Sequence, residues 1–264
     1  MINCSSSAQQ QRTNVSKDIE EAAETRKKEI ATLSAINSCS SLHGDFLFRP
    51  LALADIPSVV RIATHEFLED EPHCRALGLH AENAGQLVEY IVRRCCHYAF
   101  SVVTTLRSTG QIVAFRLMSI GHRSPSDDVI PFHPVVSSSN ALVLCAMNQQ
   151  LENNFWTNQK ASTLKILRHE LTFVSAGHRR RGIASHLLHL GLHFNQLKAL
   201  GITGILVNAS TNEMQSLLER AGYRCAAEAT TRSVDTPWCR LLNDPTMPTN
   251  TDSLKLMYIA IKES

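Results

Sequence analysis

One stretch of the sequence, residues 164–223, restricts the fold more than any other, because strand patterns alternate there with helical patterns and glycine-containing turns. Its centre opens with an apolar run typical of the end of a buried strand, formed by Leu171, Phe173 and Val174. A turn with one glycine and three consecutive arginines follows, and then a helical pattern over residues 182–199 that ends at Gly201. The centre is therefore predicted to be a strand, a basic turn and a helix.

The basic turn has the residues of an anion-binding site. The first amides of a helix have no partners within the helix and carry the positive end of its dipole, which suits a phosphate. Small residues keep side chains away from these amides, so a diphosphate can approach them. We assign this role to Arg179, Arg180, Arg181, Gly182, Ile183, Ala184 and Ser185. The alternative is an arginine cluster that covers an ordinary connection between a strand and a helix.

The turn fits Arg-x-x-Gly-x-Ala and resembles the acetyl-CoA loop of the GCN5-related N-acetyltransferases (GNATs), which has the form Gln/Arg-x-x-Gly-x-Gly/Ala. That family usually has a proline before the arginines, where this chain has Ala176. Further matches follow in order: a buried strand at residues 202–210, a short helix at 212–221, and Gly222-Tyr223, similar to the family's Gly-aromatic ending. Several matches in the right order are more specific than one.

The resemblance covers roughly residues 46–262 and implies the GNAT fold, of class α/β (α+β mixed). It implies a twisted, mixed and mostly antiparallel sheet of about seven strands that splays between two parallel strands, with helices on both faces. In the family, backbone groups of the strand that here holds Leu171, Phe173 and Val174 bind the pantetheine arm. A backbone N–H there polarises the thioester carbonyl.

A second motif narrows the resemblance. After a first strand at residues 45–53, a helix that starts near Asp55 ends in an acidic run before Pro72, and proline biases the preceding Glu71 away from helical conformation. Asp70-Glu71-Pro72 resembles the arylalkylamine N-acetyltransferases of insects and other invertebrates, in which this glutamate is taken as the base that deprotonates the amine. For this role the pKa of Glu71 should be raised by partial burial. A solvated helix end is the alternative interpretation.

The same group has two hydroxyl residues, four positions apart, that serve the leaving thiol. Ser210 matches the first, and we predict it as a catalytic residue. Met214 replaces the second and cannot donate a proton, so Thr211, Tyr223 or water would have to substitute. An ordinary serine at a strand end is an equally good interpretation of Ser210.

The remaining elements are placed by periodicity. We predict a helix at residues 81–97, a hairpin at 101–121 with its turn at 108–110, a helix at 140–154 and a last strand at 254–262. The arylalkylamine group has an insertion like the helix at 140–154, where it helps to wall the amine pocket.

The chain divides into two parts. Residues 1–43 are rich in Ser, Gln, Lys and Glu and poor in large apolar groups, so we predict a mobile or disordered N-terminal tail. A regulatory or partner-binding arm is the alternative. Residues 44–264 are predicted to form the GNAT domain.

Composition excludes several classes of function. The 26 basic and 24 acidic residues give a net charge of +2, so we expect no nucleic-acid or membrane partner. The longest apolar run, residues 141–147, is too short to span a bilayer, and the eight cysteines show no CxxC pair. His186, His189 and His193 share helical spacing and are interpreted as a half-exposed helix face, with no metal. We expect a cytoplasmic monomer.

The resemblance implies an enzyme that transfers an acetyl group directly from acetyl-CoA to small arylalkylamines such as dopamine, serotonin, octopamine or tyramine, with Glu71 as general base. Two alternatives remain. One is acetylation of polyamines or of protein amines on the same fold. The other is a CoA-binding regulatory module that has lost turnover, which Met214 favours.

Overall fold

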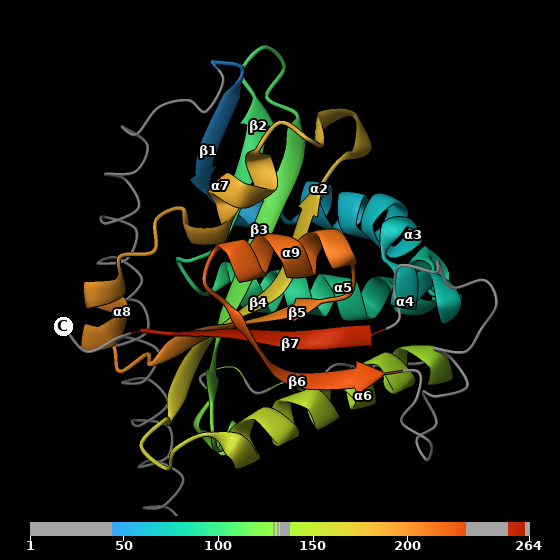
Figure 1. Ribbon diagram of the computed structural model, residues 1–264. Coiled ribbons are helices and arrows are strands. Elements are labelled where there is room, and N and C mark those ends of the chain that lie inside the picture. Colours follow the sequence, from blue (N-terminus) through green and yellow to red (C-terminus); the bar gives the residue numbers. More distant parts are fainter. Residues whose placement is uncertain (1–43, 129, 131, 133–137, 231–252, 262–264) are drawn as a thin grey trace, which may run out of the picture.

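The computed structural model describes residues 44–128, 130, 132, 138–230 and 253–261. The predicted tail, residues 1–43, lies outside this part of the chain. Within it, seven strands form one sheet in the order β1-β2-β3-β4-β5-β7-β6 (Figure 1). The strands are β1 (Phe46–Pro50), β2 (Val102–Leu106), β3 (Ile112–His122), β4 (Lys165–Val174), β5 (Gly204–Ala209), β6 (Arg224–Thr230) and β7 (Ser253–Ala260). The strands β1, β2, β3, β5 and β7 match the predicted ones to within a few residues, and β4 ends at Val174 as predicted.

Among these strands β4 and β5 are parallel and the other neighbours are antiparallel, which confirms the predicted mixed sheet. The parallel pairing joins residues 167–169 to residues 205–207, and β4 then continues to Val174 beside β3 alone. The register between β3 and β4 slips at this level and leaves Glu170 as an extra, bulged residue. The two parallel strands therefore part toward their C-terminal ends, as predicted.

Helices cover both faces of the sheet. The described α-helices are α2 (Ile56–Ile62), α3 (Leu68–Asp70), α4 (Pro72–Ala76), α5 (Ala81–Cys96), α6 (Ser139–Asn158), α7 (Ile183–His189), α8 (Phe194–Ala199) and α9 (Asn212–Arg220). Short turns are η2 (Leu53–Asp55), η4 (Pro125–Asp127), η5 (Ala176–His178) and the π-helical η3 (Ala63–Phe67), which joins α2 to α3. Helices α2, α4, α5 and α6 bury their apolar residues against one face and α7, α8 and α9 against the other (Figure 1).

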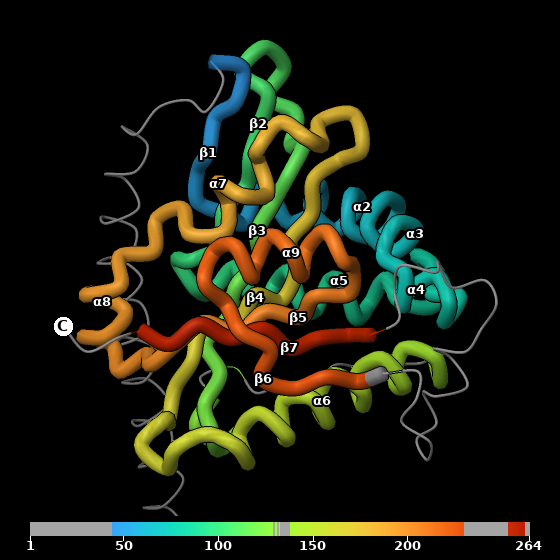
Figure 2. Tube along the Cα trace, viewed as in Figure 1, coloured from blue at the N-terminus to red at the C-terminus, as the bar shows by residue number. Residues whose placement is uncertain are grey.

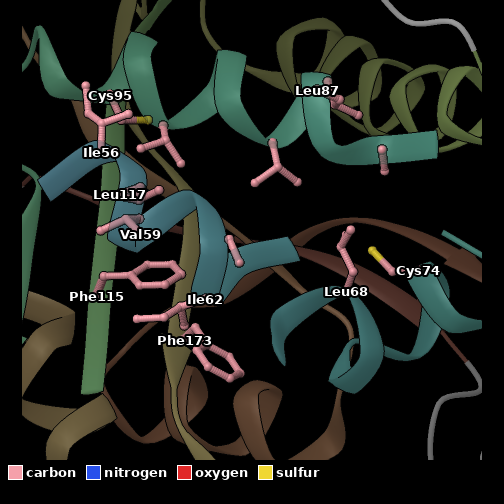
Figure 3. Close-up of a cluster of buried hydrophobic side chains, with 14 of the residues drawn as sticks. Ile56, Val59, Ile62, Leu68, Cys74, Leu87, Cys95, Phe115, Leu117 and Phe173 are labelled. Carbon is pink, nitrogen blue, oxygen red and sulfur yellow. The ribbon is translucent and has the colours of Figure 1, made fainter. Parts of the chain in front are cut away.

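The core beneath α2 fixes the helix that leads to Asp70 and Glu71, which are called the acidic corner below. Figure 3 shows Val59 and Ile62 of α2 directed toward the rings of Phe115 on β3 and Phe173 on β4. All four side chains are buried, and burial of a residue of this size is worth about 1.5–3 kcal/mol. Since this packing anchors α2 and η3, the helix end at Asp70 is held over the sheet.

Two helix predictions need correction. The predicted helix at residues 182–199 breaks into α7 and α8, because Leu190 turns to a ψ of 122° and Gly191 adopts a φ of +72°. His193 therefore does not share a helix face with His186 and His189. The predicted helix at 140–154 is longer, since α6 has 20 residues and begins after Ser138, whose hydroxyl accepts a hydrogen bond from the Ala141 amide.

Candidate functional site

Glu71 occupies the sharp corner between α3 and α4. Its φ of −73° and ψ of 121° are extended, as expected for the residue before Pro72. Its backbone N–H still donates to the Phe67 carbonyl at 2.8 Å, while its carboxylate caps α4 by accepting from the Cys74 amide at 2.6 Å. The predicted break in the helix is confirmed, and the carboxylate is held by the backbone of the next turn.

Two further groups hold this carboxylate. Nδ1 of the buried His73 lies 3.1 Å from Oε1 of Glu71, and the nearby Ser210 hydroxyl also favours the ionised carboxylate. Burial favours the neutral acid, but His73, the Cys74 amide and Ser210 outweigh it and lower the pKa of Glu71 to about 2. The expectation of a raised pKa is therefore wrong, because it considered burial without the hydrogen-bond partners.

The structure brings together the two predicted catalytic residues, which are distant in the sequence. Ser210 directly follows β5, and the Glu71 corner lies over β4, where the Phe67 and Phe173 rings meet edge to face with centroids 6.2 Å apart. Glu71 and Ser210 thus approach each other across the region where β4 and β5 part. The suggested substitutes for a second hydroxyl have other partners: Thr211 caps α9 through the Met214 amide. The Tyr223 hydroxyl lies 3.1 Å from Nε2 of His189.

The basic turn lies between β4 and α7, and Figure 2 traces the chain through it. Arg180 and Gly182 both have positive φ, 62° and 76°, and no side chain caps the first turn of α7. A Cβ added to Gly182 would meet no atom within 4 Å, so the space beside the first amides of α7 is open. Arg179, Arg180, Arg181, Gly182 and Ser185 are exposed and Ala184 is partly buried. The turn therefore has the geometry and charge to hold a diphosphate.

Some predicted cofactor residues can offer only their backbone. Ile183 packs in the core against β1, and Phe173 and Leu171 belong to the core under α2. Val174 packs against the same cluster as Ile183, and its carbonyl accepts from Nε of Arg179 at 3.0 Å. Beyond residue 169 the edge of β4 that faces β5 is no longer paired with it, so this edge has backbone groups for a ligand.

Two contacts join the basic turn to the acidic corner. Arg179 forms a two-point ion pair with Asp70, with Nη1–Oδ1 at 2.9 Å and Nη2–Oδ2 at 2.8 Å. The Ser175 hydroxyl donates to Oε2 of Glu66 at 2.7 Å. The residue that opens the Arg-x-x-Gly-x-Ala turn is thus bound to the neighbour of Glu71. Sequence reasoning did not predict either contact, since nothing local relates residues so far apart in the chain.

A buried ionic network beside the bulge was also missed. Arg94 of α5 donates to Glu170 at 2.7 Å and to Asp128 at 3.2 Å. Arg168 of β4 donates to Glu152 of α6 at 2.8 Å and to Asp128 at 2.9 Å. The network ties α5, α6 and β4 together. The signal in the sequence is Arg94, which has helical spacing with the apolar residues of α5 and therefore had to be buried with a partner.

The histidines on the opposite face have separate contacts. The rings of His186 and Phe48 meet edge to face with their centroids 4.7 Å apart, and the ring of His189 stacks on that of Tyr223. In the described part of the chain no group of three or more His, Cys, Asp or Glu is arranged to hold a metal ion. A membrane-crossing helix is likewise not found there, since none of the described helices is sufficiently long and apolar.

Comparison with known proteins agrees with this geometry. No family model and no curated protein matches the sequence. Among solved structures, arylalkylamine N-acetyltransferase 2 from Aedes aegypti has a TM-score of 0.63 and 16% identity, over 82% of this chain and 99% of its own. This chain has the GNAT fold.

Two other structures with the GNAT fold are similar. The mosquito arylalkylamine N-acetyltransferase like 5b has a TM-score of 0.65 and 11% identity, over 81% of this chain and 99% of its own. The Drosophila melanogaster polyamine N-acetyltransferase, which forms N-acetylagmatine, has a TM-score of 0.63 and 14% identity, over 82% of this chain and all of its own, 100%. The fold therefore resembles that of invertebrate arylalkylamine N-acetyltransferases, and the acceptor has to be argued from the site.

Proposed function

We propose that this protein is an acetyl-CoA-dependent N-acetyltransferase that acts on the amino group of small arylalkylamines such as dopamine, serotonin, octopamine or tyramine. One observation carries the proposal: the fold places the Glu71 carboxylate near Ser210, whose hydroxyl favours its ionised form, at the point where β4 and β5 part. The likeness to the mosquito enzymes supports the choice of acceptor.

The basic turn is the proposed diphosphate site. The amides of α7 and the exposed Arg180 and Arg181 would bind the phosphates, and the edge of β4 that leaves β5 would bind the pantetheine arm through its backbone. Bound acetyl-CoA supplies the acetyl group as a thioester. An N–H on that edge of β4 polarises the carbonyl, which assists attack by the amine.

Glu71 is the proposed partner of the amine. Amines of this class are protonated at neutral pH, with a pKa near 10, and only the neutral form is nucleophilic. A carboxylate with a pKa of about 2 is too weak a base to hold that proton, so its role in the proposal is to bind the ammonium by charge and to relay the proton to water. The amine nitrogen then bonds to the acetyl carbon and the carbon–sulfur bond breaks. The second proton of the nitrogen is lost as the amide forms, and it reaches the departing thiolate through Ser210 or water.

A second acceptor class is supported by one comparison. The Drosophila polyamine N-acetyltransferase has the same fold with a TM-score of 0.63, so polyamines belong in the same assay. A CoA-binding module without turnover is the third possibility, because Met214 cannot donate a proton. We also propose that the protein is a cytoplasmic monomer and needs no metal. Sedimentation of the purified protein would test the monomer, and metal analysis would test the absence of a metal.

Release of free CoA thiol over a panel of arylalkylamines, polyamines and peptides tests these possibilities. We expect turnover on arylalkylamines, and Glu71→Ala should lower kcat by about 100-fold with little change in acetyl-CoA affinity. Glu69→Ala, at an exposed position on the same helix end, is the matched control and should keep its kcat. Turnover on polyamines or peptides alone would reject the proposed acceptor, and binding without turnover on any amine would reject the enzyme.

A further inference from the structure

His73 lies beside the proposed amine site, and neither the acetyl-CoA motif nor the acidic corner assigns it a role. It is the second residue of α4, and its side chain is 4% exposed. Nδ1 lies 3.1 Å from Oε1 of Glu71, whereas Nε2 is buried and has no hydrogen-bond partner among the described residues. An ordinary core residue with this volume would be apolar, so a half-satisfied imidazole at this position requires an explanation.

The surroundings of the two ring nitrogens of His73 determine which of them carries the hydrogen. A buried N–H without an acceptor is costly, so the hydrogen of the neutral ring is placed on Nδ1 and a lone pair on Nε2. Nδ1–H then donates to Glu71 whether the ring is neutral or charged. Because the Cys74 amide donates to Oε2, the two carboxylate oxygens are held by donors from successive residues of α4.

We propose that His73 is a positioning residue of the amine site: its Nδ1–H keeps the Glu71 carboxylate ionised and fixed toward the incoming ammonium group. This inference rests on the proposed function. The two residues act together through geometry, since Pro72 fixes the extended turn that places the His73 ring against the carboxylate. In either protonation state the Nδ1–H donor orients the Glu71 carboxylate.

The other groups around the carboxylate do not replace His73. Cys74 contributes its amide, while burial raises the pKa of its thiol well above the ordinary value, so the thiol stays neutral. Ser210, from the end of β5, contributes a neutral hydroxyl. The neighbouring Asp70 is paired with Arg179 on the exposed side of the corner. His73 is therefore the partner of Glu71 that is able to carry a positive charge.

Three variants test the role. His73→Leu removes the donor and puts an apolar side chain in its place, and His73→Asn keeps a neutral N–H donor. His65→Leu, which removes an exposed imidazole from η3, is the control. The first readout is the pH dependence of kcat with the best amine of the panel. The second is the carbon-13 signal of the Glu71 carboxyl group between pH 4 and pH 8, which needs no activity.

In the wild-type protein the Glu71 carboxyl signal should not titrate in this window. His73→Leu should bring its titration into the window, move the acid limb of kcat to higher pH and lower kcat at neutral pH by about 10-fold or more, with acetyl-CoA affinity unchanged. His73→Asn should recover most of kcat and give an intermediate acid limb, and His65→Leu should match the wild type.

An unchanged carboxyl signal and an unchanged acid limb in folded His73→Leu protein would overturn the role of His73. If that variant does not fold, an unchanged carboxyl signal in His73→Asn overturns it instead. If the wild-type protein acetylates no amine, the proposed function fails, whereas the carboxyl titration still decides whether His73 holds Glu71 ionised.

Discussion

The low pKa of Glu71 makes a quantitative prediction about stability. In the unfolded chain its carboxyl group has the ordinary pKa of 4.5, and in the folded protein the pKa is about 2. Each pH unit of difference is worth about 1.4 kcal/mol, so the ionised carboxylate stabilises the fold by about 3 kcal/mol at neutral pH. Because the folded-state pKa is the lower one, this stabilisation is complete well above pH 4.5 and is lost as the pH falls toward 2.

Glu71→Gln removes the titrating group and nearly keeps its shape. We expect the difference in unfolding free energy between wild type and Glu71→Gln to shrink on acidification, by about 1.4 kcal/mol at pH 3.5 and about 2 kcal/mol at pH 3. Urea unfolding followed by circular dichroism from pH 7 downward measures it. Glu69→Gln, at an exposed position two residues earlier, controls for removal of a carboxylate from this helix end. A difference that stays constant between pH 7 and pH 3.5 would refute the view that His73, Cys74 and Ser210 hold Glu71 ionised.

Two further predictions concern α7 and α9. Arg179→Ala combined with Gly182→Asp should weaken acetyl-CoA binding by at least about 10-fold, measured by titration calorimetry. The double change removes a positive charge and puts an acidic side chain beside the first amides of α7, at a residue with a φ of +76°. Unchanged affinity would count against the diphosphate site. Thr211→Ala should lower the free energy of unfolding by about 1 kcal/mol, because the hydrogen bond from the Met214 amide is lost. Thr211→Ser keeps the hydroxyl and should keep most of that free energy. An equal loss of unfolding free energy in both variants would rule out the cap.

Local patterns were sufficient to predict most of the sheet and several helix ends. Gly201 and Gly222 have positive φ at the ends of α8 and α9, as glycines after a helix commonly do. Pro72 gave the extended corner at Glu71 for a similarly local reason. In each case one residue restricts its own backbone, or that of its neighbour, whatever the rest of the chain does.

One error is local and the other arises where distant parts of the chain decide the outcome. The apolar spacing continues through Leu190 and Leu192, so nothing but Gly191 marked the break between α7 and α8. The direction of the Glu71 pKa depends on Ser210, which reaches it through the fold, and on the rotamer of His73. Sequence patterns indicate which residues of one helix or strand are buried, but they do not indicate which polar groups from other elements lie next to them.

The contact between Arg179 and Asp70 has a consequence for ligand binding. An anion that draws Arg179 away would release Asp70, the residue before Glu71, and binding of that kind would couple occupancy of the basic turn to occupancy of the acidic corner. Reciprocity requires that each ligand change the affinity for the other by the same factor. Since both side chains are 40% or more exposed, the pair is worth at most about 1 kcal/mol, and it limits cooperativity between the two substrates to roughly fivefold.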